Sequence, residues 1–181
     1  MITTGTGGGI GKQFEVGDVI VSPVVRYSSR KWLKNAPFGA ASYHNGAAQP
    51  KYFAEAKRLF KANAGQLPPE NTRPPRIVRV SPSALSSSIV TTDFFGFDTS
   101  NDYYKLQGLG DLSEMGDAVL GMVAKEMEPK ARRWIAVRNV SDPQIKADGL
   151  SLKQQADLAG HIYKGFGRWS SVCSAIGCPE P

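Results

Sequence analysis

Chemistry in this chain is best sought at Asp142, the last residue of the segment WIAVRNVSD at residues 134–142. Residues 134–137 are apolar, and aromatic and branched side chains in such a run are typical of a strand buried in an α/β sheet. The segment then becomes polar and ends in Ser141 and Asp142. Ligands of open α/β sheets collect at the carboxyl ends of strands, so Asp142 is expected to face a bound ligand. A turn residue before Pro143 is the competing interpretation.

A second candidate for ligand contact is the glycine-rich segment ITTGTGGGIG at residues 2–11. Glycine permits positive φ and a close approach of the backbone to a ligand, so we predict a binding loop here. Two familiar glycine signatures do not fit. A dinucleotide fingerprint that starts at Gly5 has Ile10 where its third glycine belongs, and a phosphate loop that ends at Lys12 would need a hydroxyl residue in place of Gln13.

The position of this glycine segment at the start of the chain leads to a further expectation. Such a loop normally follows a buried strand, and here that strand would lie upstream of Met1. We therefore expect a single domain over residues 1–181 that is incomplete at its N-terminus. The exposed edge of its sheet would pair with the missing segment or with another chain.

The elements that must position these residues follow from apolar periodicity. We predict strands within residues 14–25 and at residues 77–80, 89–95 and 134–137, and a proline-rich surface connector at residues 64–76. Three amphipathic helices are predicted at residues 51–63, Ser113–Met127 and Ser151–Phe166, with Ser113 and Ser151 as N-caps. The strand–strand–helix–strand–helix order predicts an α/β layer fold. In the second helix an apolar stripe is expected to pack in the core: Met115, Val119, Met122, Val123 and Met127.

Composition limits the class of protein. The chain has 181 residues, of which 41% are hydrophobic and 21% charged, with a net charge of +6. These values are typical of one globular domain, and no apolar run is long enough to span a membrane. Cys173 and Cys178 are expected to be free thiols of a soluble cytoplasmic protein, and no metal site is expected because His44 and His161 are remote. The positive charge alone leaves nucleic-acid binding as a weakly supported alternative.

Four parts of the chain together resemble the purine nucleoside phosphorylase and nucleosidase superfamily, in the right order and over residues 2–166. TGTGGGI at residues 4–10, followed by VGDVIV at 16–21, is similar to the glycine segment of that family and its next strand. IVTTDFF at 89–95 resembles the segment that carries the base-stacking aromatic residue. SEMGDAVLGMVA at 113–124 resembles the Glu-Met-Glu helix start, and VRNVSD at 137–142 resembles the Ser-Asp strand end.

The resemblance implies a three-layer α/β/α fold with a mixed central sheet, and cleavage of the N-glycosidic bond of a nucleoside by phosphate or by water. The leaving base must be protonated, and the acid implied by the resemblance is Asp142, with Ser141 as its hydrogen-bond partner. General acid catalysis of this kind contributes on the order of 10²–10⁴-fold. The resemblance also assigns substrate contacts. The nucleophile would lie beside Thr6, Gly7 and Gly8, the base against Phe95 and Met115, and the sugar near Glu114.

Plainer interpretations remain for two of these residues, since Phe95 could be core and Glu114 could favour a helix N-terminus through the helix dipole. Asp93 is expected to be structural. The chain departs from the family at Gly116, where the resemblance implies a second carboxylate that binds the ribose hydroxyls. Asp117 is no obvious substitute, because one residue further along a helix points about 100° away.

The resemblance thus predicts an enzyme without a cofactor, with a nucleoside as substrate and phosphate as co-substrate if the reaction is phosphorolysis. We expect a homo-oligomer, and neither a membrane nor a nucleic acid as partner. The alternative function is a catalytically impaired nucleoside sensor or interaction module of the same fold. The base preference and the choice between phosphate and water stay open.

Overall fold

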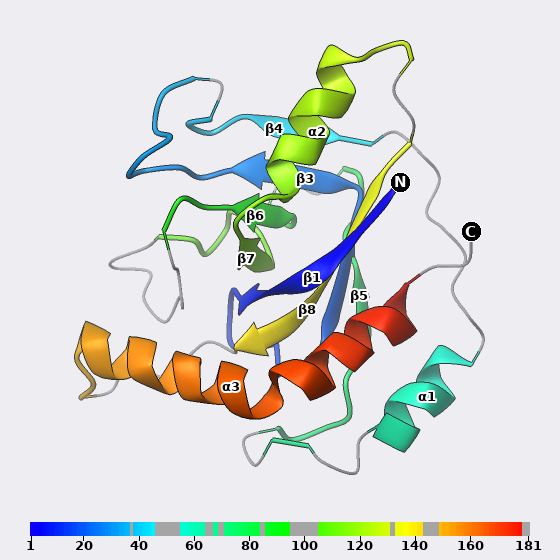
Figure 1. Cartoon of the computed structure of the whole chain (residues 1–181), viewed down its shortest axis with the longest axis vertical. Coiled ribbons are helices and arrows are strands. Elements are labelled where there is room, and N and C mark those ends of the chain that lie inside the picture. The colour runs from blue at the N-terminus through cyan, green and yellow to red at the C-terminus, as the bar shows by residue number, and fades with distance from the viewer. Residues whose placement is uncertain are drawn as a thin grey trace.

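The computed structural model describes residues 1–36, 38–45, 55–63, 67–68, 71–83, 86–94, 105–130, 133–142 and 149–178. Within these residues the chain forms a mixed sheet of eight strands with three helices (Figure 1). In chain order the elements are β1 (Ile2–Gly9), β2 (Val19–Ser22), β3 (Val24–Tyr27), β4 (Ser42–His44), α1 (Ala56–Asn63), β5 (Ile77–Arg79), β6 (Ile89–Thr91), β7 (Leu112–Glu114), α2 (Asp117–Glu126), β8 (Ile135–Asp142) and α3 (Leu152–Gly177).

The sheet has the strand order β4-β3-β6-β7-β1-β8-β2-β5, which places β1 and β8 near its middle. β1 runs parallel to β8, with Ile2 opposite Ile135, and pairs antiparallel with β7 at its far end. A bulge after Gly7 shifts the register so that Gly8 lies opposite Asp142. Bulges re-aim side chains at the end of a ladder. The end of β8 predicted to carry the chemistry therefore meets the glycine segment directly.

The glycine segment itself is a strand, and the prediction of a loop is wrong. Its glycines are needed for close approach to neighbours rather than for turning. A Cβ on Gly7 would lie 2.5 Å from the carbonyl oxygen of Ser113 and against the side chain of Leu112. A Cβ on Gly5 would collide with the guanidinium of Arg138. Glycine has low strand propensity, so sequence pattern alone predicts a loop here, although small residues are needed in this strand to avoid collisions with neighbouring side chains.

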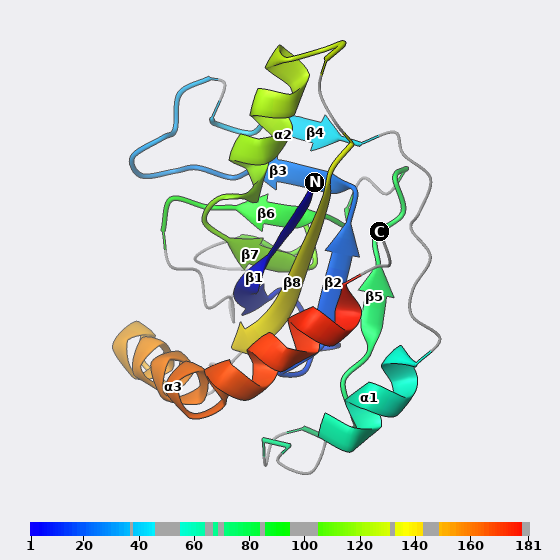
Figure 2. The same ribbon diagram turned by 45° about the vertical axis from the view of Figure 1, so that its right-hand side comes forward.

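Helices cover both faces of the sheet, which confirms the three-layer α/β/α prediction (Figures 1 and 2). Side chains alternate between faces along a strand. In β8, Ala136 and Val140 pack on the α2 side with Ala118 of that helix, whereas Ile135 and Val137 join a second cluster. That second cluster contains residues of α1 and α3: Ala56, Phe60, Ile162, Trp169 and Cys173.

The helix α2 begins four residues later than predicted, because Ser113 belongs to β7 and Gly116 is the N-cap. The helix start is held from outside the helix by Glu114, whose carboxylate accepts the amides of Gly116 and Asp117 at 2.6 and 2.9 Å. α3 begins as predicted, with Ser151 as N-cap in a capping box with Gln154, but it continues through Gly177 rather than ending near Phe166.

The apolar stripe predicted for the core of α2 is largely exposed, so that prediction is wrong. Its exposed fractions run from 40% at Val123 to 67% at Met115, and Met122 alone of the stripe packs against the core. The helix instead turns its small residues to the sheet, which lets the helix lie close to it. The buried residues of α2 are Asp117, Ala118, Gly121 and Ala124.

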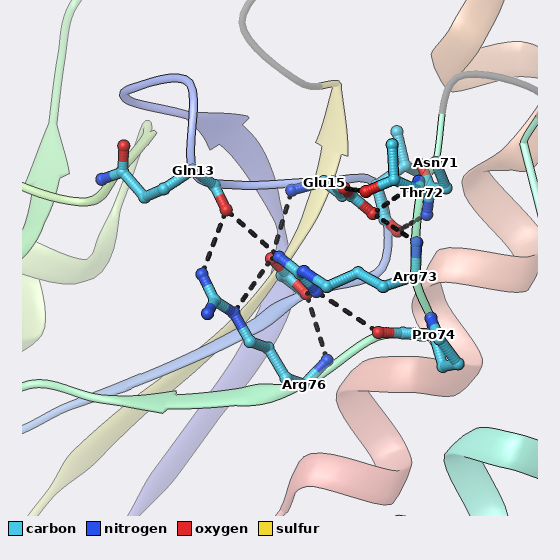
Figure 3. A network of polar contacts seen from close by, with 9 residues as sticks. Gln13, Glu15, Asn71, Thr72, Arg73, Pro74 and Arg76 are labelled. Atoms are coloured by element: carbon cyan, nitrogen blue, oxygen red, sulfur yellow. Dashed lines mark hydrogen bonds and ion pairs between the residues drawn. The ribbon is translucent and has the colours of Figure 1, made fainter.

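The described part of the proline-rich connector is tied to the turn before β2 by a polar network (Figure 3). Arg73 makes two hydrogen bonds of 2.7 and 2.6 Å to the carboxylate of Asp18, which is fully buried, and the amide of Arg76 donates to the same carboxylate at 3.1 Å. The hydrogen bond to Asp18 raises the pKa of Arg73. Glu15 accepts the amide of Thr72 at 3.1 Å. Opposite charges at close range hold this segment against the sheet.

Within the described residues, no helix is long and apolar enough to cross a membrane.

Candidate active site

A cavity of about 620 Å³ opens where the carboxyl ends of β6 and β8 meet the ends of β1 and β7. α3 forms one wall of it. Its size is that of a small-molecule site, which typically measures about 300–1,000 Å³. The cavity is lined by Thr6, Gly7, Gly8, Thr92, Phe94, Ser113, Glu114, Met115, Gly116, Arg138, Ser141, Asp142, Gly160, Tyr163 and Lys164.

Asp142 lies at the β8 end of the cavity and is 96% buried, with a relative exposure of 4%. The hydroxyl of Ser141 donates to its Oδ1 at 2.7 Å. Burial raises the pKa of Asp142 above its usual value, and the hydrogen bond from Ser141 partly offsets that rise. A carboxyl group with a raised pKa beside a cavity is suited to act as a general acid.

The β1 end supplies the floor of the cavity. Thr6, Gly7 and Gly8 line it, and their place around a nucleophile stays a prediction. The carbonyl oxygen of Gly7 also lies 3.3 Å from the hydroxyl of Ser141. Since a hydroxyl donates one proton, we assign it to the shorter contact with Asp142.

Phe95, predicted to stack on the base, lies outside the described residues. Its neighbour Phe94 is within them, and it lines the cavity together with Thr92. The Thr92 hydroxyl donates to the carbonyl oxygen of Phe94 at 2.8 Å, which holds the backbone after β6 in place. Phe94 thus brings an aromatic ring to the cavity. The stacking role of Phe95 stays a prediction.

Glu114 lines the β7 end of the cavity, yet both of its carboxylate oxygens are already engaged. Oε1 accepts the hydroxyl of Thr91 and the amide of Asp117, whereas Oε2 accepts the amide of Gly116 and lies 3.5 Å from Nη2 of Arg138. Burial, followed by the charge of Asp117, raises the pKa of Glu114, and Thr91 and Arg138 oppose this. The carboxylate thus organises the start of α2 and one wall of the cavity. Met115, exposed and next to it, adds an apolar surface.

Arg138 is a cavity residue to which the sequence analysis gave no role. Its guanidinium reaches across β1 over Gly5 and forms a two-pronged pair with Asp117, with Nε–Oδ2 and Nη2–Oδ1 distances of 2.8 and 2.5 Å. Burial alone would lower the pKa of Arg138, but the bonds to Asp117 and the charge of Glu114 raise it. A charged residue inside an otherwise buried strand was the signal that could have revealed it. Asp117 is committed to this pair, in agreement with the expectation that it does not replace the residue absent at 116.

The wall on the α3 side was also missed. Gly160, Tyr163 and Lys164 line the cavity from one face of the helix, as residues at spacings of three and four must. The prediction used apolar residues of this helix to infer core packing alone. Tyr163 and Lys164 are exposed on the helix, and the cavity shows why polar and aromatic residues occur there.

Asp93 has the structural role expected of it. Burial would raise its pKa, but hydrogen bonds from the backbone amides of Arg30, Lys31, Trp32 and Leu33 lower the pKa of Asp93 to about 2. Its charge fixes the chain after β3. Cys173 and Cys178 are free thiols. Over the described ranges, no group of three His, Cys, Asp or Glu side chains is placed to hold a metal ion.

A family model described as the phosphorylase superfamily matches residues 1–161. The chain belongs to the phosphorylase superfamily. The match extends over most of the chain, from β1 into α3, so every wall of the cavity has residues within it.

Solved structures with the same fold include nucleosidases. The 5′-methylthioadenosine/S-adenosylhomocysteine nucleosidase of Colwellia psychrerythraea, in complex with adenine, has a TM-score of 0.56 at 18% identity over 97% of this chain and 62% of its own. The Neisseria meningitidis nucleosidase of that name, in complex with methylthio-immucillin-A, has a TM-score of 0.53 at 18% identity, with coverage of 97% and 65%. The futalosine hydrolase of Helicobacter pylori has a TM-score of 0.53 at 14% identity, with coverage of 97% and 64%.

At these identities the likeness shows a shared fold. The chain spans less than two thirds of the length of these three proteins. No curated protein matches it in sequence.

Proposed function

We propose that this member of the phosphorylase superfamily cleaves the N-glycosidic bond of a nucleoside, with Asp142 as the acid that protonates the leaving base. The observation that carries the proposal is the buried Asp142 at the end of β8, beside a cavity of about 620 Å³ and held by Ser141 at 2.7 Å. Nucleosidases with the same fold support the reaction class, since two of them are 5′-methylthioadenosine/S-adenosylhomocysteine nucleosidases.

The proposed reaction follows from where the proton and the charge go. Asp142 gives its proton to a ring nitrogen of the base, the bond between that base and the sugar breaks, and the electron pair leaves with the base. The sugar carbon, now cationic, is captured by the oxygen of water or of phosphate beside Thr6, Gly7 and Gly8. A water nucleophile releases one proton to the solvent, which balances the proton that Asp142 takes up again. Ser141 keeps the carboxyl group oriented, and it stabilises the carboxylate left after proton transfer. No cofactor takes part.

Base release from a panel of purine and pyrimidine nucleosides, with and without phosphate, tests the proposal. Asp142→Asn should lower kcat/KM on the order of 10²–10⁴-fold, because the amide cannot give up a proton. Asp142→Glu is the matched control, because it restores an acid of slightly different reach. A requirement for phosphate would identify phosphorolysis, and activity without it would identify hydrolysis. Full activity in Asp142→Asn would refute the assignment of the acid.

A second candidate function is a nucleoside sensor with impaired catalysis. It is favoured by the β7 end of the cavity, where Gly116 offers no carboxylate and Glu114 is already engaged. Nucleoside binding, measured by calorimetry, without base release under any of the above conditions would support the sensor.

A further inference from the structure

A second cavity, of about 480 Å³, lies at the opposite end of β8 from Asp142. It is bordered by β4, by the C-terminal part of α2 and by Trp134, the residue before β8. A strand rises about 3.3 Å per residue, so the length of β8 puts this cavity roughly 25 Å from Asp142. The two cavities are therefore separate, and the second is also large enough for a small molecule.

Close packing and a hydrogen bond fix the walls of the second cavity. α2 lies over β3 and β4 (Figures 1 and 2). A Cβ on Gly121 of this helix would lie 2.6 Å from the Cβ of Tyr43 and 2.7 Å from Cγ2 of Val25, so the glycine lets the helix pack directly against both strands. On another side, Nδ2 of Asn45 donates to the carbonyl oxygen of Trp134. This bond joins the end of β4 to the start of β8.

The second cavity combines aromatic residues with a cationic rim. Tyr43 and Trp134 line it, and both pack in the core cluster on the α2 side of the sheet. Lys125 and Arg133 line it from the last turn of α2 and from the segment before β8, and both are exposed. A guanidinium binds phosphate through two parallel hydrogen bonds, and an ammonium adds a point charge. These residues are therefore complementary to a ring compound that carries an anionic group.

One carboxylate, that of Glu128, also lines the second cavity and pairs with Lys125 at 2.8 Å. The side chains of Lys125 and Glu128 are 69% and 58% exposed, and an ion pair between such exposed groups contributes little to stability. Lys125 can therefore turn from Glu128 to an anionic ligand at small cost. Glu128 itself would repel that ligand, so removing its charge should strengthen binding.

We propose that the second cavity binds a ring compound that carries a phosphate group and is about the size of a mononucleotide. The phosphate lies at Arg133 and Lys125, and the ring lies against Tyr43 and Trp134. A phosphate monoester has a charge of about −1.5 to −2 near pH 7 and three acceptor oxygens, which suits two cationic donors better than a carboxylate does. The proposal stands apart from the proposed function, since the described residues that line the first cavity are a different set.

Calorimetry with adenosine 5′-monophosphate tests the proposal. Arg133→Gln removes a charge from an exposed side chain and should weaken binding about ten- to a hundredfold. Glu128→Gln removes the repelling charge and should strengthen binding about two- to fivefold. Lys130→Gln is the matched control, because Lys130 is an exposed cation near Arg133 that does not line the cavity, and it should leave the affinity unchanged. Ribose 5-phosphate, which lacks the base, should bind about tenfold more weakly than the nucleotide.

A loss of affinity in Arg133→Gln together with a gain in Glu128→Gln supports the proposal. No binding of the nucleotide at about 1 mM overturns it, and so does an affinity that Arg133→Gln leaves unchanged. An equal loss in Lys130→Gln would mean general attraction to a basic surface, and would also overturn it. A loss in Lys164→Gln but not in Arg133→Gln would place the nucleotide in the first cavity and overturn the site. Equal affinity for ribose 5-phosphate would overturn the ring as part of the ligand.

Discussion

Arg138 neutralises two buried carboxylates, and its removal should show how much the fold depends on that charge. Arg138→Met keeps a long side chain of similar reach and removes the guanidinium that contacts Asp117 at 2.5 Å and Glu114 at 3.5 Å. The side chains of the two acids are 1% and 3% exposed, so water cannot replace the lost partner. Removing one partner of a buried ion pair typically costs about 3–5 kcal/mol, a large part of a domain stability of about 5–15 kcal/mol.

The loss should depend on pH, and its sign can be worked out. The pKa of Glu114 is raised in the fold above its usual value of 4.5, so the folded state holds the proton more tightly than the unfolded chain does. Such a group destabilises the fold progressively as the pH rises above 4.5. Arg138 opposes the rise in pKa, so Arg138→Met should extend it and enlarge the penalty at neutral pH. Near pH 4 the carboxyl is protonated in both states and the variant should recover part of the loss.

Urea unfolding at pH 7.5 and pH 4 measures both effects. With a slope of about 2 kcal/mol per molar urea, the expected loss lowers the midpoint at the higher pH by about 1.5–2.5 M. Arg138→Lys retains the charge without the two-pronged geometry. Its urea midpoint at pH 7.5 should lie between those of the unchanged chain and Arg138→Met. A loss below about 1 kcal/mol at pH 7.5, or an equal loss at both pH values, would refute the argument that this cation holds the site together.

Three further predictions concern other parts of the chain. The pKa of Asp142 is raised in the fold above its usual value of 3.8, so kcat/KM should fall as the pH rises through the raised pKa. For the same reason Asp142→Asn should unfold at a higher temperature than the unchanged chain at pH 8 and at the same temperature at pH 3. A destabilised Asn variant at pH 8 would contradict this. Arg73→Met leaves the buried Asp18 with its weaker contacts to Arg76. In urea titrations this variant should lower the free energy of unfolding by about 2–3 kcal/mol. The control Arg58→Met, which changes an exposed residue, should alter that free energy by less than about 0.5 kcal/mol. We also expect a second copy of the chain to cover the exposed stripe of α2, which is continuous with Met115 at the cavity. Sedimentation should show Val123→Lys as a monomer and the similarly exposed Val172→Lys as an unchanged oligomer. Identical sedimentation of the two variants would contradict this.

The sequence was informative wherever periodicity and side-chain chemistry agreed. The strand that ends in Asp142 combined apolar residues with a polar end, and α3 began at the capping residue predicted for it. Short motifs were enough to predict the superfamily, because they contain many of the residues that line the cavity. The order of elements predicted an α/β layer fold, and the resemblance to the superfamily implied its three layers.

The errors have a common cause, which is that packing partners far along the chain outweighed local pattern. Residues 2–9 contain four glycines and look like a loop, yet they form a strand because Leu112 and Arg138 need the space above them. The stripe of α2 has core periodicity, but the helix buries its small residues instead. Arg138 could not be assigned from sequence alone, since its role depends on Asp117 lying across β1 from it.

The single helix α3 connects the interior of the protein to the mouth of the cavity. Its C-terminal half lies against the sheet and α1 (Figure 2). There Trp169 donates to the carbonyl oxygen of Asn63 on α1, and Ser174 donates to Oδ1 of Asn139 on β8 at 2.6 Å. Gly160, Tyr163 and Lys164 border the cavity. The helix rises 1.5 Å per residue, so the cavity wall lies about 10 Å from Trp169, and a tilt of about 10° at that anchor moves the wall by about 2 Å. Repacking around Trp169 would therefore tilt the helix and change the width of the cavity, although Trp169 does not line the cavity.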